Sequence, residues 1–305
     1  MHELVSLAHE VGFVTSADAL SRGFGRNTLR RLSSSGALVR TSFGVYLAPG
    51  DRTPEARHAL MTRALLHLDP YSVASHHSAL ALLGVALYGV PLQQVHLADA
   101  RCSSRRHESV HRHVLRGGDV VRTLEGGLRC IEPAHAALQV AARYGPASGI
   151  VSLDAALRAA LCTDEDLERV LRSGRIRRGL RLARHAAEHA DGRAESPGES
   201  LLRGIVAGMP WSYDLQVNVG GPGRGYRVDI LVEECVAVEF DGNVKYQGAD
   251  GPKALIDEKR REDYLRGLKF EVVRVVWADL RHPTTVQRAI HDALVRARTS
   301  RRVAA

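Results

Sequence analysis

Acidic side chains gather on two adjacent segments of this chain, 226–232 and 236–241, which alternate apolar and polar residues as strands do. A turn of three residues, 233–235, aligns the apolar side chains of both segments and is a permitted hairpin length. This register places Asp229 directly opposite Glu239 on the other face. The side chains expected on the shared apolar face are Val228, Ile230, Val232, Val236, Val238 and Phe240.

The register brings three carboxylates, those of Asp229, Glu239 and Asp241, to one side of the hairpin. Like charges at this distance repel, and the pKa of one group rises unless a cation neutralises them. Oxygen ligands select a hard ion, so the cluster predicts a site for Mg²⁺ or Mn²⁺. Such an ion polarises a phosphodiester, supplies hydroxide and neutralises the charge of an in-line attack. The alternative is an exposed hairpin whose outer face is acidic and binds no ion.

All four lysines of the chain lie between 245 and 269, beside these carboxylates, whereas every other strongly basic residue is arginine. An ammonium is a compact charge with an adjustable pKa, which suits chemistry that a guanidinium cannot perform. The alternative is a helix-forming segment that has drifted toward lysine.

Residues 196–294 resemble the PD-(D/E)XK nucleases, in the branch similar to very-short-patch repair endonucleases. The matching motifs are SPGESLLR with Glu199, YRVDILV with Asp229, AVEFDGNVKY with Glu239 and Asp241, and the closing EKRREDYLRGLKFEVVRVVWADL. The resemblance implies a restriction-endonuclease-like α/β domain. It also implies that Asp229 and Glu239 bind metal, and that Glu199, on a helix, assists them.

The sequence departs from the family's Glu-x-Lys pattern, because Asp241 stands where the lysine is expected. The catalytic lysine must come from elsewhere, and the choice lies between Lys245 and Lys259. We favour Lys245, which follows Asp241 by four residues, because Lys259 has a helical partner in Asp263. Glu199 is equally well explained as part of a capping box that begins at Ser196.

The first 50 residues predict three short helices and a hairpin, the outline of a winged helix-turn-helix domain. The third helix, 26–35, turns Leu29 and Leu32 inward, and the hairpin covers 38–47. The side chains that this helix offers to base edges and phosphates of the major groove are Arg26, Asn27, Thr28, Arg30 and Arg31. The alternative is a small helical domain with an ordinary basic face.

The first half of the chain resembles the AbiEi antitoxin family. The motifs are GRNTLRRLSSSGALVRTSFGVYLAPG and, more weakly, ASHHSALALLGV. The resemblance implies a DNA-binding regulator of the antitoxin type.

The middle of the chain predicts helices at 54–68, 72–83, 133–144, 153–161 and 164–172, with strands near Val95, 110–115 and Leu128. Two runs of arginines, 101–129 and 169–184, suggest either a track for DNA or solvated faces. The histidines of this region invite a metal site, but no cysteine or carboxylate spacing supports one, so none is predicted: His76, His77, His107, His111 and His113.

The composition favours an anionic partner, because the net charge is +8 and the isoelectric point lies near 9.6. Four scattered cysteines without a CxxC pair indicate neither a zinc ribbon nor a disulfide framework, and they fit a reducing cytosol. The longest apolar stretch is too short to span a bilayer. We therefore expect a cytoplasmic, nucleoid-associated protein without membrane contact.

These observations predict a multidomain α/β protein. Its parts are a winged helix-turn-helix domain (1–50), a mixed α/β middle domain (51–192) and a nuclease-like domain (193–305). The leading function is divalent-metal-dependent endonuclease activity on duplex DNA, with RNA as the alternative substrate. The rival is an antitoxin-type transcriptional regulator whose nuclease-like domain is catalytically silent. Further expected partners are a second copy of the chain and, for an antitoxin, another protein.

Overall fold

The computed structural model describes residues 2–41, 44–101, 105–107, 109–221, 224–242 and 261–303. The chain divides into two compact units. The first unit comprises Met1–Ser152 and Leu161–Arg184, and the second comprises Leu153–Ala160 and His185–Ala305. Both units mix helices with a sheet, so the predicted α/β class is confirmed at that level. The division into three domains stays a prediction.

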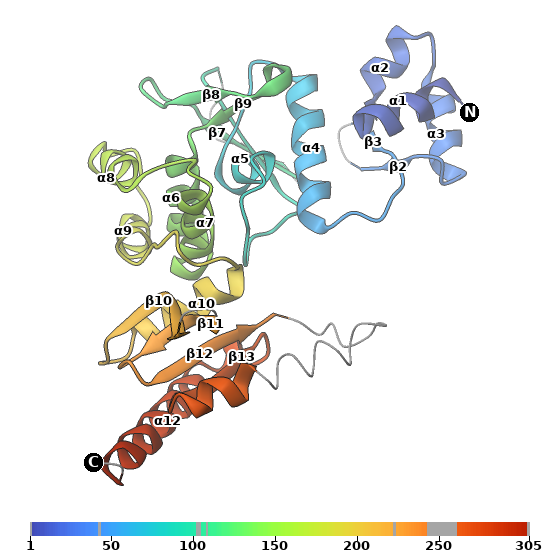
Figure 1. The fold of residues 1–305 in the computed structure, drawn as a ribbon. Helices are drawn as coiled ribbons and strands as arrows, with labels where there is room; N and C mark the ends of the chain where they lie inside the picture. Colours follow the sequence, from blue (N-terminus) through green and yellow to red (C-terminus); the bar gives the residue numbers. More distant parts are fainter. Residues whose placement is uncertain are drawn as a thin grey trace. The chain divides into compact units, whose positions relative to one another are not determined.

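The N-terminal segment contains the three predicted helices and the hairpin (Figure 1). Its elements are α1 (Glu3–Val11), β1 (Phe13–Thr15), α2 (Ser16–Ser21), α3 (Arg26–Ser34), β2 (Val39–Arg40) and β3 (Val45–Leu47). The strands form an antiparallel sheet in the order β1-β3-β2, and β1 had not been predicted. Helix α2 begins where it does because Thr15 and Asp18 form a reciprocal capping box.

A small apolar core holds this segment together. Leu4 and Ala8 of α1 pack with Leu29 and Leu32 of α3, and all four side chains are buried. The inward orientation of Leu29 and Leu32 is therefore as predicted. The opposite side of α3 is left to the solvent.

The rest of the first unit is built around a six-stranded sheet in the order β6-β7-β5-β4-β9-β8. Its strands are β4 (Val73–Ala74), β5 (Val95–Asp99), β6 (Arg105–His107), β7 (Val110–Val114), β8 (Val121–Thr123) and β9 (Arg129–Ile131). The helices of this part of the chain are α4 (Pro54–Leu68), α5 (His76–Leu82), η1 (Glu125–Gly127), α6 (Pro133–Tyr144), α7 (Pro146–Arg158), α8 (Asp164–Arg172) and α9 (Leu180–Glu188).

Helices α4, α6 and α8 have the predicted bounds, whereas α5 and α7 do not. Helix α5 starts later than expected because Val73 and Ala74 pair as a strand. Helix α7 starts seven residues earlier than position 153, at Pro146, because proline is well suited to the first turn of a helix. The glycine and serines that follow Pro146 have weak helix propensity, which hid this start in the sequence. Helix α9 had not been placed.

The second unit has the predicted order of helix, three strands, helix, strand and helix. Its elements are α10 (Pro197–Ala207), β10 (Tyr213–Gly221), β11 (Arg224–Val232), β12 (Val236–Asp241), a helical segment at 261–267, β13 (Glu271–Val276), η2 (Asp279–Arg281) and α12 (Pro283–Val303). The sheet order is β10-β11-β12-β13, antiparallel except for the parallel pair β12 and β13.

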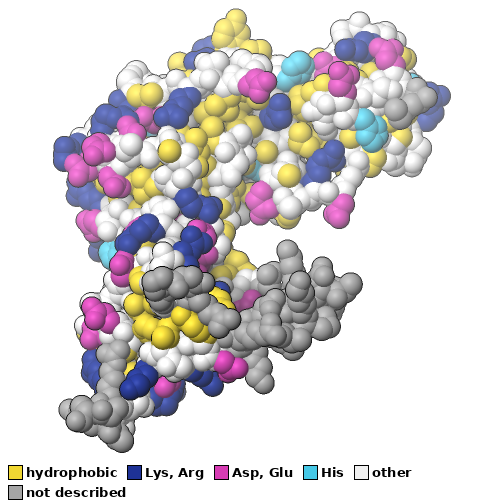
Figure 2. All heavy atoms as spheres, viewed as in Figure 1, with side chains coloured by type: hydrophobic (Ala, Val, Ile, Leu, Met, Phe, Trp, Pro, Cys, Tyr) yellow, Lys and Arg dark blue, Asp and Glu magenta, His cyan; other side chains and the backbone are white. Residues whose placement is uncertain are grey.

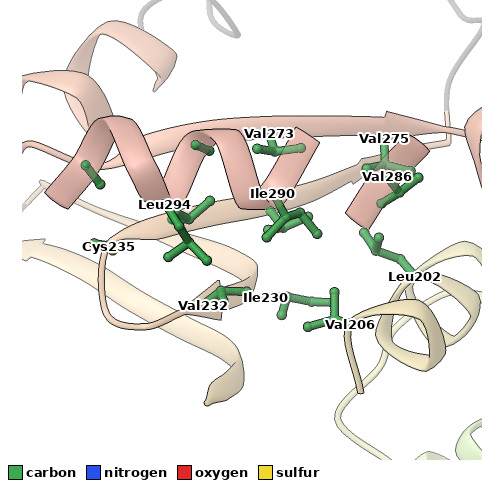
Figure 3. Close-up of a cluster of buried hydrophobic side chains, with 14 of the residues drawn as sticks. Leu202, Val206, Ile230, Val232, Cys235, Val273, Val275, Val286, Ile290 and Leu294 are labelled. Atoms are coloured by element: carbon green, nitrogen blue, oxygen red, sulfur yellow. The ribbon is translucent and has the colours of Figure 1, made fainter. Parts of the chain in front are cut away.

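Apolar side chains bury both faces of this sheet. On one face, α10 and α12 pack against the strands, and Leu202, Ile230, Val273 and Ile290 meet in the main cluster (Figure 3). On the other face, Leu265 from the 261–267 helix packs against Val228 and Ala237. The sheet is thus covered on both sides near the predicted carboxylates.

Candidate functional site

The hairpin between β11 and β12 has the predicted register, with Val232 paired to Val236 and Ile230 to Val238. The three-residue turn is closed by the N–H of Cys235, which donates to the carbonyl of Val232 at 3.1 Å. Glu233 and Glu234 lie in the left-handed region, with φ of +48° and +53°. Backbone of that hand fits the twist of a tight hairpin turn.

The prediction that Val228 shares a face with Ile230 is wrong. Val228 packs in the cluster around Leu265, whereas Ile230 packs in the cluster with α10 and α12. The exchange of faces occurs at Asp229, and the residue across from it on β10, Gln216, has a left-handed φ of +54°. A residue of that conformation breaks the two-residue alternation of a strand. The distortion therefore lies at the predicted metal ligand.

The carboxylates of Asp229 and Glu239 are held by different groups. An oxygen of Asp229 accepts a hydrogen bond from the backbone N–H of Phe240 at 2.8 Å. The Glu239 side chain, 11% exposed, accepts one from the guanidinium of Arg261 at 2.5 Å. Arg261 also donates to the carbonyl of Arg227 at 2.7 Å. Asp241 ends β12 and is half-buried.

Glu199 is more than a helix cap. Its N–H donates to the hydroxyl of Ser196 at 3.2 Å, which is half of the expected capping box. Its carboxylate, however, accepts from the N–H of Glu195 at 2.9 Å rather than from that of Ser196. The same oxygen accepts from the amide of Gln216 at 2.8 Å, so Glu199 is tied to the distorted part of β10.

Neighbouring negative charges raise the pKa values of Glu199 and Asp229. Burial raises the pKa of Glu199, and the nearby charge of Asp229 raises it further. Burial likewise raises the pKa of Asp229, with a further rise from Glu239, while the Phe240 N–H and Arg261 oppose it. A hard cation would relieve this repulsion, and the donors are all oxygens, so the residues fit Mg²⁺ or Mn²⁺.

Arg261 is the residue of this site that sequence reasoning missed. It lies in the EKRREDYLRG motif, and the position of its guanidinium on Glu239 could not be read from spacing alone. Lys245 and Lys259 lie outside the described residues, so the choice between them stays a prediction. The roles of all six proposed site residues stay predictions as well.

Helix α3 presents its basic residues to the solvent. Arg26, Asn27, Arg30 and Arg31 are exposed and Thr28 is half-buried. Within the described part of the chain, none of the three arginines has an ion-pair partner. These side chains are therefore available to an external anion.

The arginines of the middle region divide into paired and unpaired ones. Arg101 and Arg112 bind Asp69, and Arg169 binds Glu132 at 2.7 Å. Figure 2 shows acidic side chains among the basic ones over α8 and α9. Within the 169–184 run, the exposed arginines that have no ion-pair partner among the described residues are Arg177, Arg178, Arg181 and Arg184. The side chains of Arg105, Arg106 and His107 lie outside the described ones.

Among the described residues, no helix is long and apolar enough to cross a membrane.

Family comparisons match two parts of the chain. Residues 2–49 match the family described as transcriptional regulator, AbiEi antitoxin, and residues 71–187 match the AbiEi antitoxin C-terminal domain. The region predicted as a middle domain of unknown role thus carries an AbiEi domain. The restriction-endonuclease-like fold of residues 196–294 stays a prediction.

Two curated relatives cover almost the whole chain. They are Uncharacterized protein MT2308 of Mycobacterium tuberculosis (strain CDC 1551 / Oshkosh) and Uncharacterized protein Rv2248 of Mycobacterium tuberculosis (strain ATCC 25618 / H37Rv). Each is 30% identical over 272 residues, which is 87% of this chain and 95% of the relative. The chain therefore belongs to the same family as these two mycobacterial proteins, and it carries both the regulator domain and the C-terminal domain of AbiEi antitoxins.

Proposed function

We propose that the protein is a DNA-binding regulator of the antitoxin type, whose residues 2–49 form a winged helix with α3 in the major groove. The observation that carries the proposal is the exposed face of α3, where Arg26, Arg30 and Arg31 lack ion-pair partners within the described residues. The order α1-β1-α2-α3-β2-β3 and the match to an AbiEi regulator support it.

The parts of the segment have separable roles on duplex DNA. Arg26 and Asn27, in the first turn of α3, would reach base edges, since residues near the start of a recognition helix enter the groove first. Arg30 and Arg31 lie a turn further along and would bind phosphates. Leu29 and Leu32 fix the rotation of the helix through the core beneath it. As an antitoxin, the protein would have a second protein as its partner.

Replacing Arg26, Arg30 and Arg31 together by alanine is expected to remove most DNA binding. The phosphate contacts of Arg30 and Arg31 are lost, so the slope of log K against log salt should become shallower by roughly 2. The measurement is a fluorescence-anisotropy titration of duplex DNA with the full chain at several salt concentrations. The duplex should include the DNA upstream of the gene, where a regulator of this type would bind.

The matched control removes three exposed arginines of the 169–184 run, as Arg177→Ala, Arg178→Ala and Arg181→Ala in one chain. It changes the net charge by the same amount, and its slope should stay closer to that of the wild type. A larger loss in this control than in the α3 variant would transfer DNA binding to the middle region. Salt-independent binding by the wild type would contradict the proposal altogether.

Metal-dependent phosphodiester cleavage is a second candidate function. The observation that favours it is the proximity of Glu199, Asp229 and Glu239, because the charge of Asp229 raises the pKa of Glu199 and the charge of Glu239 raises the pKa of Asp229. Asp229, Glu239 and Asp241 would hold Mg²⁺ or Mn²⁺, which supplies an activated water and charge neutralisation when bound. Glu199 would orient the site through Gln216, and Arg261 would hold Glu239 in place. Cleavage of supercoiled plasmid with and without Mn²⁺ tests this candidate.

If the protein cleaves DNA, Lys245→Ala should lower the cleavage rate at least about a hundredfold with little change in DNA affinity. This is the pattern expected for a lost transition-state interaction. The measurement is single-turnover cleavage beside an anisotropy titration. Near-normal cleavage by Lys245→Ala together with an inactive Lys259→Ala would assign the role to Lys259.

A further inference from the structure

A group of histidines converges inside the first unit from three separate elements. His76 begins α5, His96 lies on β5 and His113 lies on β7. One ring nitrogen from each lies within 4.8 Å of the others. Strands β5 and β7 are parallel neighbours, which sets His96 and His113 on the same face. His96 was not among the histidines for which the sequence suggested a metal site.

The spacing is close to that of a bound zinc ion. In a tetrahedral site with Zn–N distances near 2.0–2.1 Å, two ligand nitrogens lie roughly 3.3 Å apart. The Nε2 atom of His113 and the Nδ1 atom of His96 are 3.0 Å apart. The ring of His76 lies 4.4 Å from that of His113 and 4.6 Å from that of His96, measured between centroids. Small ring rotations would bring the three nitrogens to one ion.

Burial and neighbouring positive charges keep the three imidazole rings neutral, which is the form that binds a metal ion. Burial lowers the pKa of His76, His96 and His113, and the neighbouring histidines and Arg143 lower it further. The pKa of His113 falls to about 3. The imidazoles are therefore neutral at physiological pH, and neutral imidazole is the form that ligates zinc.

Hydrogen-bonding partners orient two of the three rings. The hydroxyl of Tyr144 lies 3.1 Å from Nε2 of His96, which leaves Nδ1 of that ring for the ion. The hydroxyl of Ser75 lies 3.1 Å from Nδ1 of His76. Such partners fix the tautomer and orientation of a ligating histidine. His76 and His96 are buried while His113 is half-buried, which provides a path from solvent.

Buried histidines also occur as ordinary hydrogen-bonded core residues, but the backbone at His76 favours a site. Its φ is +52°, a left-handed conformation in a residue that has a side chain. Such backbone strain is found most often at functional and ligand-binding sites. Core packing alone gives no reason to place a strained histidine where two other imidazoles meet.

We propose that His76, His96 and His113 bind one Zn²⁺ ion and leave its fourth position open to water or an exogenous ligand. The ion would join the start of α5 to strands β5 and β7. Three histidine ligands with one open position are the arrangement of catalytic zinc rather than of a closed structural site.

The test uses the full chain, stripped of metal by a chelator and then offered Zn²⁺ alone. We expect one tightly bound Zn²⁺ per chain by elemental analysis after gel filtration, and its affinity is measured by competition with a chromogenic chelator. His96→Asn should weaken binding at least about a hundredfold, and Tyr144→Phe by about 10–100-fold, since the latter removes only the hydroxyl that orients His96. Co²⁺ should give the strong visible absorption of a four-coordinate ion in the wild type and lose it in His96→Asn.

The matched control is a second group among the described residues, His185, Glu188 and His189, at the end of α9, where His185 and Glu188 are exposed and His189 is half-buried. Replacing His185 and His189 by asparagine should leave zinc stoichiometry and affinity unchanged. Should His96→Asn fail to fold, the Tyr144→Phe affinity and the cobalt spectrum decide. The proposal is overturned if the wild type retains no Zn²⁺, or if the zinc is lost with His185 and His189 rather than with His96.

Discussion

Replacing Arg203 by methionine is expected to destabilise the second unit by about 3–5 kcal/mol, because it leaves the buried carboxylate of Asp154 without its cation. The two side chains are 2% and 1% exposed, and two of their hydrogen bonds are 2.6 and 2.8 Å long. The Asp154 carboxylate also accepts from the N–H of Asp191 at 2.7 Å, and Arg203 donates to the carbonyl of His189. Burial is the largest influence on the pKa of Asp154 and raises it.

The change in the free energy of unfolding is measured by urea unfolding followed by tryptophan fluorescence. This signal reports on the second unit, because both tryptophans of the chain, Trp211 and Trp277, lie there. Asp154→Leu should cost a similar amount when made alone. The double variant should cost much less than the sum, since a buried ion pair replaced by apolar groups is often tolerated.

The matched control is Arg298→Met, which breaks an ion pair with Glu233 in the same unit. The Arg298 side chain is 60% exposed, so the loss should be no more than about 1 kcal/mol. Equal costs for Arg298→Met and Arg203→Met, or strict additivity in the double variant, would contradict the importance assigned to the buried pair.

The buried pair also bears on the candidate site, because Arg203 lies one helical turn after Glu199 on α10. At the start of that helix, a Cβ on Gly198 would lie 2.0 Å from the ring of Phe240. Phe240 stands between Glu239 and Asp241 on β12 and packs against the main core cluster. The packing of α10 against Phe240 therefore fixes the position of Glu199 relative to β12, the strand that carries Glu239 and Asp241.

Local patterns predicted the elements of this chain where capping and periodicity were strong. Helix α4 begins at Pro54 after Thr53, whose hydroxyl accepts from the N–H of Ala56, and its bounds agree with the prediction. The hairpin register followed from apolar alternation near the turn. Both features depend on residues that are close in the sequence, which a single sequence displays directly.

The features that sequence could not predict depend on distant residues or on backbone conformation. Asp154 and Arg203 are 49 positions apart, and nothing local marks either as buried. The exchange of faces at Asp229 coincides with left-handed backbone at Gln216, and glutamine carries no signal for that conformation. The proposed zinc ligands lie on a helix and two strands that are far apart in the sequence, as His76, His96 and His113. No short spacing of ligand residues therefore predicts the site.

Asp229→Asn and Glu239→Gln are each expected to abolish metal-dependent cleavage, with a rate loss well beyond a hundredfold, if the second unit cleaves DNA. Both changes keep the shape of the side chain while removing the charge that would hold Mg²⁺ or Mn²⁺. Asparagine can still accept from the N–H of Phe240, so the strand pairing should survive. The measurement is nicking of supercoiled plasmid in Mn²⁺, with unfolding curves showing that both variants fold.

Glu233→Gln is the matched control, because it removes a carboxylate from the turn of the same hairpin. Glu233 accepts from Ser212 and pairs with Arg298, so it belongs to the far end of the hairpin from Asp229 and Glu239. This variant should cleave like the wild type. Activity that persists in EDTA, or in both Asp229→Asn and Glu239→Gln, would overturn the metal site. A wild type that neither cleaves nor binds Mn²⁺ would leave the regulator as the function, with the carboxylates held apart by Arg261 and the Phe240 N–H rather than by an ion.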